Sequence, residues 1–250
     1  MYDRESETPI GYYIRKRGNY YMKNECVICE APLEYLDTDV VMECAICHKK
    51  EYSKIRCKNG HYVCNDCHMR GLNNIIGLCM KHTSDDPLEI LDVMMAQPFS
   101  HMQGPEHHVM VGAALLTAYK NAGGEIDLRP ALVEMMKRGK AVPGGACGFW
   151  GTCGAAISAT MFVSIVMKIT PLSEEPLGLS LKLNAKIMDE IGALGGPRCC
   201  KRGSFISILN GIEFAEEHLG VEMKRSKVNC KFSQQNNQCI KSRCPFYKGE

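Results

Sequence analysis

Eight cysteine and histidine residues near the N-terminus have the spacing of metal ligands. They are Cys26, Cys29, Cys44, Cys47, Cys57, His61, Cys64 and Cys67. Three of the cysteine pairs are separated by two residues, which lets a tight knuckle direct both sulfur atoms at one tetrahedral zinc ion. Eight ligands divide into two zinc sites, with ligand pairs that are either sequential or interleaved along the chain. The spacing does not decide between these pairings.

The surroundings of these ligands indicate a structural zinc module. Residues 21–84 contain few long aliphatic runs, so bound metal must replace a hydrophobic core. Gly60 offers the positive φ that a knuckle needs before His61. His48 and His68 directly follow their knuckles, and either could substitute for a neighbouring ligand. The ligand string resembles treble-clef and RING-like fingers, and a zinc site saturated with Cys and His has no open position for catalysis.

A second group of reactive residues lies in three blocks that each begin a predicted helix, within 104–108, 144–154 and 195–202. The candidate catalytic residues are Cys147, Cys153, Cys199, Cys200, His107 and His108. Because helix N-termini and basic neighbours favour a thiolate, we expect a lowered pKa for Cys153 and an electropositive setting for Cys199 and Cys200. These adjacent cysteines could close a strained disulfide or hold a soft metal or sulfur.

The same blocks also allow simpler interpretations. His107 and His108 lie about 100° apart on a helix, so at most one of them is expected to point inward as a ligand or a base. The glycines of 144–154 could form a tight turn that lets helices pack closely. No glycine motif for a dinucleotide or a P-loop is present, and the C-x3-C-x2-C spacing of radical S-adenosylmethionine enzymes is also missing.

Three further cysteines lie in the basic C-terminal tail, and they are Cys230, Cys239 and Cys244. Three thiolates invite a fourth ligand, which Cys79, Cys199 or Cys200 could supply. Such a site would bind an iron–sulfur cluster or a third zinc ion. The alternative is a structural knuckle that fixes the tail.

The composition favours a cytoplasmic globular protein. A net charge of +2, from 30 basic and 28 acidic residues, creates no field that attracts nucleic acid or an anionic membrane. The longest apolar stretch, 155–169, is interrupted by polar residues, and the charged N-terminus has no apolar signal core, so neither a membrane span nor export is expected. In a reducing compartment, 15 cysteines are better explained as metal ligands or redox thiols than as disulfides.

Helix start and stop signals predict helices at about 87–96, 105–123, 127–139, 152–168, 179–194 and 204–219. The fold is therefore predicted to be mainly α, with ribbon hairpins only in the zinc module. The predicted units are an arm (1–20), the zinc module (21–84), an all-helical domain (85–220) and a cysteine-rich basic tail (221–250) packed on the helical domain.

The blocks G-P-E-H-H, C-G-F-W-G-x-C-G-A-A and G-G-P-R-C-C-K-R resemble those of a family of archaeal and bacterial proteins, methanogens among them. The resemblance extends from Cys26 to Cys244, and it implies no activity. More loosely, Cys153 to Ala159 resembles the helix start of small all-helical proteins named C-GCAxxG-C-C, which are presumed to be redox-active. In this chain Ala159 replaces the usual glycine, and a zinc unit precedes the helices.

These observations lead to one leading hypothesis and two alternatives. The leading hypothesis is a redox or sulfur-handling protein that uses the cysteines of the helical domain, such as a thiol or iron–sulfur oxidoreductase or a sulfur transferase, with Cys153 as the reactive thiolate. The first alternative is a non-enzymatic zinc adaptor that docks a partner enzyme or nucleic acid. The basic run at 49–58 fits nucleic acid only weakly, because such runs are usually solvated. The second alternative, an enzyme that modifies tRNA or a cofactor, lacks a visible substrate pocket in the sequence.

Overall fold

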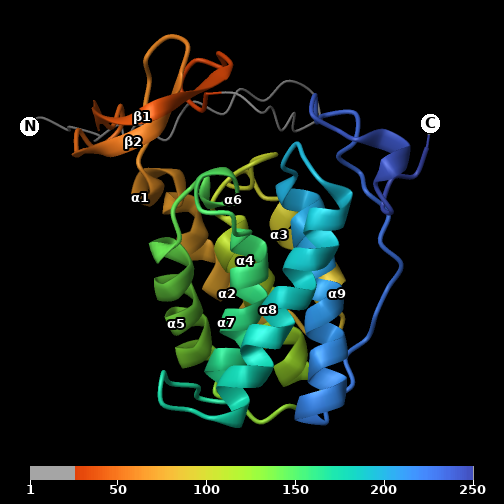
Figure 1. The fold of residues 1–250 in the computed structure, drawn as a ribbon. Helices are drawn as coiled ribbons and strands as arrows, with labels where there is room; N and C mark the ends of the chain where they lie inside the picture. The colour runs from red at the N-terminus through yellow and green to blue at the C-terminus, as the bar shows by residue number, and fades with distance from the viewer. Residues whose placement is uncertain (1–25, 250) are drawn as a thin grey trace, which may run out of the picture.

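An antiparallel hairpin opens the part of the chain that the computed structural model describes, residues 26–249. Strand β1 (Leu33–Glu43) pairs with β2 (Lys50–Cys57) so that Leu33 faces Cys57 and Glu43 faces Lys50. The register is irregular between Tyr35 and Val40. Figure 1 shows the hairpin at one end of a group of roughly parallel helices. The predicted arm, 1–20, lies outside the described residues.

Nine α-helices follow within the described residues, together with short 3₁₀ turns at Arg70–Asn74 and Lys241–Arg243. The helices are α1 (Asn65–His68), α2 (Ile75–Lys81), α3 (Pro87–Met95), α4 (His107–Asn121), α5 (Leu128–Ala141), α6 (Ala146–Phe149), α7 (Gly154–Val166), α8 (Glu175–Leu194) and α9 (Cys200–Leu219). A two-stranded sheet and these helices agree with the predicted combination of a ribbon module and a helical domain.

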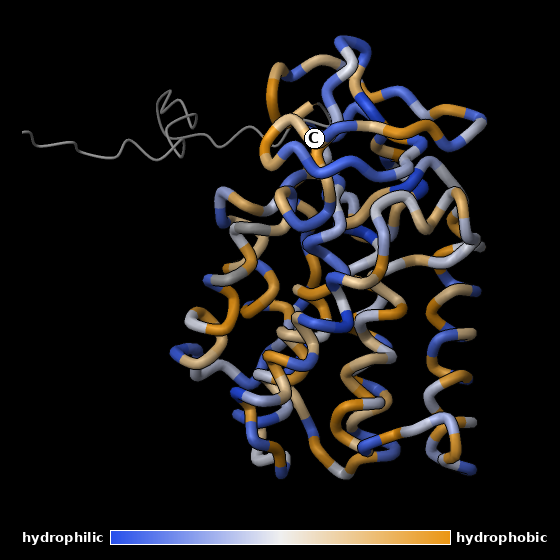
Figure 2. Tube along the Cα trace, turned by 90° about the vertical axis from the view of Figure 1, so that its left-hand side faces the viewer, coloured by the Kyte–Doolittle hydropathy of each residue, from blue (hydrophilic) through white to orange (hydrophobic). Residues whose placement is uncertain are grey.

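Helix α4 is the centre of the helical domain, because α2, α3, α5, α7 and α9 all pack against it. Every residue from His107 to Tyr119 is buried. A helix that is enclosed on all sides needs small residues where its neighbours come closest, and α7 contributes Ala155, Ala156 and Ala159 to this core. In Figure 2 most other helices alternate hydrophobic and hydrophilic segments, as expected for helices with one face in solvent.

Local capping signals explain several helix ends. Asp86 precedes Pro87 and its carboxylate accepts a hydrogen bond from the Leu88 N–H at 2.8 Å, which fixes the start of α3. Asp127 is the N-cap residue of α5, as predicted. Gly220 ends α9 with a φ of 65°, the left-handed conformation that favours glycine.

Two helices begin earlier than predicted. Helix α8 starts at Glu175 and has a proline in its first turn. Proline lacks an N–H, but the N–H groups of the first turn have no acceptor within the helix, so no hydrogen bond is lost. Helix α9 starts at Cys200, because the Cys199 sulfur accepts a hydrogen bond from the Arg202 N–H at 3.4 Å and caps the helix. Helices α1, α2 and α6 have no predicted counterpart, since each is short and depends on its neighbours.

The hydrophobic core extends beyond the predicted helical segments. Met69, Leu72 and Ile75 belong to the core of the helical domain, although the sequence analysis placed them in the metal-binding module. In the tail, Phe232 is buried in the same core and Phe246 packs against it. Figure 1 shows the tail running along α9 toward the hairpin end of the molecule.

No disulfide joins the cysteines of the described region, all of which are free. Within this region, none of the helices has the length and apolar character that a membrane crossing requires.

We expect Gly112→Ala to lower the free energy of unfolding by about 1–3 kcal/mol, because overpacking strains a dense core. A Cβ at Gly112 would lie 2.8 Å from the Ser158 carbonyl oxygen and closer still to the Met135 side chain. Gly178→Ala in α8 is the matched control, since a Cβ there meets nothing within 4 Å. This substitution should raise the free energy of unfolding by about 0.5–1 kcal/mol. Urea denaturation of both variants measures the difference, and equal midpoints would contradict the packing argument.

Candidate metal centres and a thiol-lined cavity

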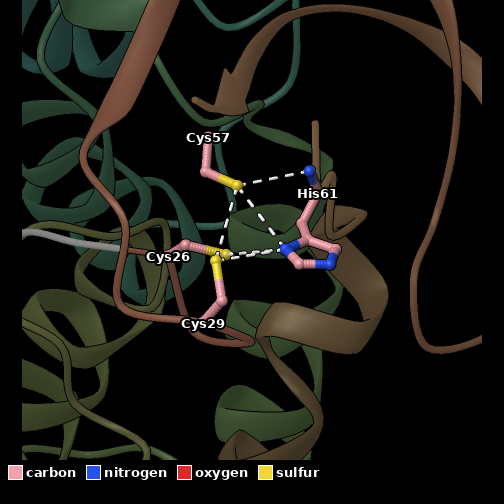
Figure 3. A group of neighbouring side chains, drawn as sticks. All are labelled: Cys26, Cys29, Cys57 and His61. Carbon is pink, nitrogen blue, oxygen red and sulfur yellow. Dashed lines mark hydrogen bonds between the residues drawn. The ribbon is translucent and has the colours of Figure 1, made fainter. Parts of the chain in front are cut away.

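The first metal-ligand cluster contains Cys26, Cys29, Cys57 and His61, whose ligand atoms all lie within 4.8 Å of one another. Figure 3 shows the three sulfur atoms and the His61 ring nitrogen directed at a common centre. The Cys29 and Cys57 sulfurs are 3.8 Å apart, and His61 Nδ1 lies 3.2 Å from the Cys29 sulfur. This group can hold a metal ion.

The second cluster contains Cys44, Cys47, Cys64 and Cys67, again within 4.8 Å. The Cys47 and Cys64 sulfurs are 3.6 Å apart, and the Cys64 N–H donates to the Cys44 sulfur at 3.4 Å. The first and third ligand pairs therefore form one cluster, and the second and fourth pairs form the other. The structure thus selects the interleaved pairing from the two that the sequence allowed.

The backbone repeats one device at both N-terminal knuckles. Glu30 and His48, each one residue after the second cysteine of a pair, have φ values of 59° and 61°. This left-handed residue turns the chain back, so that the Cys26 N–H donates to the Ala31 carbonyl and the Cys44 N–H to the Lys49 carbonyl, both at 2.9 Å. Gly60 has the predicted positive φ, at 83°.

The pKa values of the cluster thiols diverge without a metal. Backbone hydrogen bonding, chiefly from Ala31, lowers the pKa of Cys29 to about 6. Burial raises the pKa of Cys44, but N–H donors from Cys64 and neighbouring residues outweigh it and lower the value to about 6. Burial raises the pKa of Cys26 to about 11. Metal binding must therefore displace protons from the thiols that retain them.

A cavity of about 1080 Å³ lies between the hairpin and the helical domain. The Arg198 guanidinium lies over the Tyr35 ring at 5.3 Å, and the Tyr35 and Phe149 rings are 6.3 Å apart, so the hairpin forms one wall. Helix α6, the start of α7 and the loop before α9 line the rest. The structure therefore contains a cavity that the sequence did not display.

All six predicted catalytic residues line this cavity, and they are Cys147, Cys153, Cys199, Cys200, His107 and His108. Cys147 is exposed, whereas the other three cysteines are partly buried. The two consecutive cysteines lie in different surroundings. Cys200 interacts electrostatically with Cys153, whereas the Cys199 sulfur accepts from the Asn236 amide at 3.7 Å and interacts with Cys244 of the tail.

The predicted lowering of the Cys153 pKa is wrong. Its sulfur accepts hydrogen bonds from the N–H groups of Ala155 and Ala156, as its position before α7 predicts, but burial has the larger effect and raises the pKa. Burial also raises the pKa of Cys199, and that of Cys200 to about 12. The helix end alone does not produce a thiolate, because the sulfur is withdrawn from water.

The expectation that only one of His107 and His108 points inward is also wrong. Both are buried, because α4 is surrounded by other helices on every side. His107 Nδ1 donates to the Gly104 carbonyl at 2.9 Å, and His108 Nδ1 donates to the Val142 carbonyl at 3.1 Å. Burial lowers the pKa of His107 to about 3 and also lowers that of His108, so both imidazoles are neutral.

The three tail cysteines surround a second, small cavity of about 20 Å³ together with Cys199. Of the three candidates for a fourth ligand, Cys199 is thus the one that lies with the tail. Cys79 is buried in α2 near the Ala113 carbonyl, and Cys200 faces the large cavity. Among the described residues, the tail sulfurs do not form a group within 4.8 Å as the hairpin ligands do.

The sequence analysis missed one group, His68, His101 and Glu106, whose ligand atoms also lie within 4.8 Å. His68 was considered only as a substitute ligand for the hairpin, and His101 was not considered. Gly104 is the first residue of the G-P-E-H-H block. It leaves room for the Glu106 carboxylate, because a Cβ at this position would lie 2.6 Å from Glu106 Oε1. That glycine was the only local signal for a packed carboxylate.

The hairpin and its interleaved ligands form two clusters that could hold metal ions, and a set of packed helices follows them. Residues 75–247 match the family described as Family of unknown function (DUF5714), and the chain belongs to this family. The matched residues include the cavity cysteines and the tail, but the eight hairpin ligands precede them. No curated protein and no solved structure matches the chain.

We expect Cys57→Ser to reduce the bound metal by at least one equivalent. The replaced sulfur belongs to the first cluster, so that cluster keeps only three ligands and binds its metal more weakly. Strand β2 connects this cluster to the second one, so loss of the first ion also destabilises the hairpin. Elemental analysis of the purified protein measures the loss. Cys147→Ser is the control, since Cys147 is exposed and lies outside both clusters. An unchanged metal content in Cys57→Ser would contradict the assigned ligand set.

Proposed function

We propose that the protein is a metal- and thiol-dependent redox protein whose cavity cysteines exchange with disulfide substrates, while zinc ions hold the hairpin in place. The observation that carries this proposal is the convergence of Cys147 and Cys153 from one segment, and of Cys200 from another, on one cavity. Electrostatic interactions connect Cys153 with both Cys147 and Cys200.

Zinc is the metal that best fits the hairpin clusters. Four sulfur or nitrogen ligands at about 2.3 Å from a tetrahedral ion lie about 3.8 Å from one another. The sulfur–sulfur distances of 3.8 Å and 3.6 Å in the hairpin agree with this spacing. Both sites are saturated by protein ligands, so the zinc ions have a structural role.

The exposure of the cavity thiols suggests their roles. Cys147 is exposed and meets a substrate first, whereas Cys153 is partly buried and its pKa is raised. The Cys147 thiolate attacks a disulfide RSSR, forming a mixed disulfide and releasing one RS⁻. Cys153 then attacks the mixed disulfide, releasing the second RS⁻ and leaving a Cys147–Cys153 disulfide. The two thiol protons pass to the two released thiolates, so the protein loses two electrons and RSSR gains them.

In this proposal His108 takes the proton from Cys153. Its Nδ1 donates to the Val142 carbonyl, so Nε2 carries the free lone pair of the neutral ring. The ring packs so closely against Gly154, the residue after Cys153, that a Cβ there would lie 2.3 Å from Nε2. The neutral imidazole would accept the proton that the attack releases. Burial works against this transfer, because it lowers the pKa of His108 and raises that of Cys153.

We expect one equivalent of an aromatic disulfide reagent to give a Cys147–Cys153 or Cys147–Cys200 disulfide in the native, metal-loaded protein. Peptide mapping by mass spectrometry identifies the bond, and the coloured thiol released should reach two equivalents. Cys147→Ser should lower the rate of the first release at least about tenfold, because the accessible sulfur is gone.

Cys79→Ala is the matched control, because Cys79 is buried outside the cavity. Only mixed disulfides at the surface, with no internal bond, would contradict dithiol chemistry. A persulfide on a cavity cysteine of the purified protein would instead identify sulfur transfer as the reaction.

We further propose that Cys199, Cys230, Cys239 and Cys244 hold an iron–sulfur cluster. Cys230 interacts electrostatically with the other three, and all four line one cavity. One zinc ion would require four sulfurs within about 3.8 Å of one another. The wider spread of the tail sulfurs fits a cluster, whose thiolates bind different iron atoms.

We expect anaerobically purified protein to contain iron and sulfide, and Cys239→Ser to lose both while the zinc content stays unchanged. Iron, sulfide and zinc analysis together with the visible absorption spectrum measure this. Cys79→Ala is again the control. A third equivalent of zinc lost from Cys239→Ser, with no iron in either protein, would assign the tail to zinc instead.

A non-enzymatic adaptor is the second candidate, and one observation favours it. Val41 and Tyr52 face each other across the hairpin, and 57% and 74% of their surfaces are exposed. Exposed apolar pairs of this kind often contact a protein partner. Unreactive cavity thiols, in a protein with fully loaded hairpin sites, would favour this role.

A further inference from the structure

Three side chains converge at the junction between the hairpin module and the helical domain. His68 is the last residue of α1 and directly follows the cluster residue Cys67. His101 lies in the segment before α4, and Glu106 is the N-cap residue of α4. His68 Nδ1 lies 3.6 Å from Glu106 Oε2, and His101 Nδ1 lies 3.5 Å from Glu106 Oε1. The two imidazole rings have centroids 4.3 Å apart. These groups come from parts of the chain with no common sequence motif.

The polar atoms that face one another in this group have no hydrogen-bond partner. His68 Nδ1, His101 Nδ1 and Glu106 Oε2 are all buried and unpartnered. Glu106 is 0% exposed, and its one hydrogen bond here comes from the His101 N–H to Oε1 at 2.8 Å. Leaving three buried polar atoms without partners at one point is costly, so their arrangement requires an explanation.

A bound cation explains both the missing partners and the distances. Ligand atoms at about 2.1 Å from a tetrahedral metal ion lie about 3.4 Å from one another. The 3.6 Å between His68 Nδ1 and Glu106 Oε2 matches this spacing and is too long for a good hydrogen bond, and His101 Nδ1 lies within 4.8 Å of both ligand atoms. Two imidazole nitrogens and one carboxylate are a donor set that first-row divalent metals accept.

We propose that His68, His101 and Glu106 form a third metal site that binds a divalent transition-metal ion, Zn²⁺ or Fe²⁺. Three protein ligands leave at least one coordination position for an exchangeable ligand, unlike the saturated hairpin clusters. Both histidines line the large cavity, so such a ligand arrives from the space that also contains the cavity cysteines. The site therefore has the composition of a reactive metal centre.

One alternative is an ion pair between Glu106 and a protonated histidine, since His68, His101 and His107 all have Nδ1 within 3.6 Å of its oxygens. A second is a buried ion pair between Glu106 and Lys201, which is also 0% exposed. The Lys201 ammonium instead donates to the Ser100 hydroxyl at 2.9 Å and lies 4.8 Å from the centre of the Phe232 ring. Within the described residues, no ion pair of 4.0 Å or less joins it to Glu106. Lys201 thus leaves Glu106 Oε2 free to bind a cation.

The test is a titration of the zinc-loaded full-length protein with Co²⁺ alone as the probe. Cobalt at this site should give absorption without sulfur-to-metal charge transfer, because no cysteine is a ligand. Glu106→Gln and His101→Gln should weaken this binding at least about tenfold, since even changes behind the ligands cost 10–100-fold. His48→Gln is the matched control: its side chain is 75% exposed beside Cys47 and belongs to none of the three groups.

A second measurement does not depend on any variant remaining folded. Anomalous diffraction at the zinc and iron edges should place an ion within bonding distance of His68 Nδ1, His101 Nδ1 and Glu106 Oε2, and the edge identifies the metal. No ion there, or unchanged cobalt affinity in folded Glu106→Gln and His101→Gln, would overturn the proposal. Neither outcome changes the dithiol test, which concerns different residues.

Discussion

The two ligand clusters of the N-terminal hairpin are the feature on which the rest of the structure depends. The hairpin has its own buried cluster, but that cluster consists of Cys44, Cys64 and Cys67, which are themselves candidate metal ligands. With so little apolar burial, a two-stranded hairpin is not stable in water. Ions bound at these clusters would supply the stabilisation that a core otherwise gives. Because the hairpin is also one wall of the large cavity, the shape of that cavity depends on the same ligands.

The distribution of cysteines shows how one residue type is used for different purposes within a single chain. The hairpin gathers sulfurs at close range, the cavity arranges Cys147, Cys153 and Cys200 around open space, and the tail surrounds a small void. Cys199 and Cys200 lie at the boundary between the last two groups. Successive residues at a helix start point in directions about 100° apart, so one turn of α9 serves both groups.

Local signals in the sequence predicted the local structure well. Asp86 caps α3 with its side chain, Asp127 is the N-cap residue of α5 and Gly220 ends α9 through its left-handed backbone, and the structure has those ends where they were expected. The start of α9 was not predictable in the same way, because it depends on a cysteine acting as a cap. The long-range features were also beyond the sequence. The interleaved ligand pairs and the group around Glu106 bring together segments that lie at irregular distances along the chain. No sequence periodicity therefore predicts these contacts.

Helix α1 is one short turn that contains Cys67 and His68 and has Cys64 as its N-cap residue. Its sulfurs are fixed by the second hairpin cluster, and its imidazole reaches Glu106 of the helical domain. The order of maturation follows from this geometry. If the second hairpin cluster must bind its ion before His68 is held in position, the nascent protein gains its junction only after it has bound metal. Metal supply would thereby control when the finished molecule is assembled.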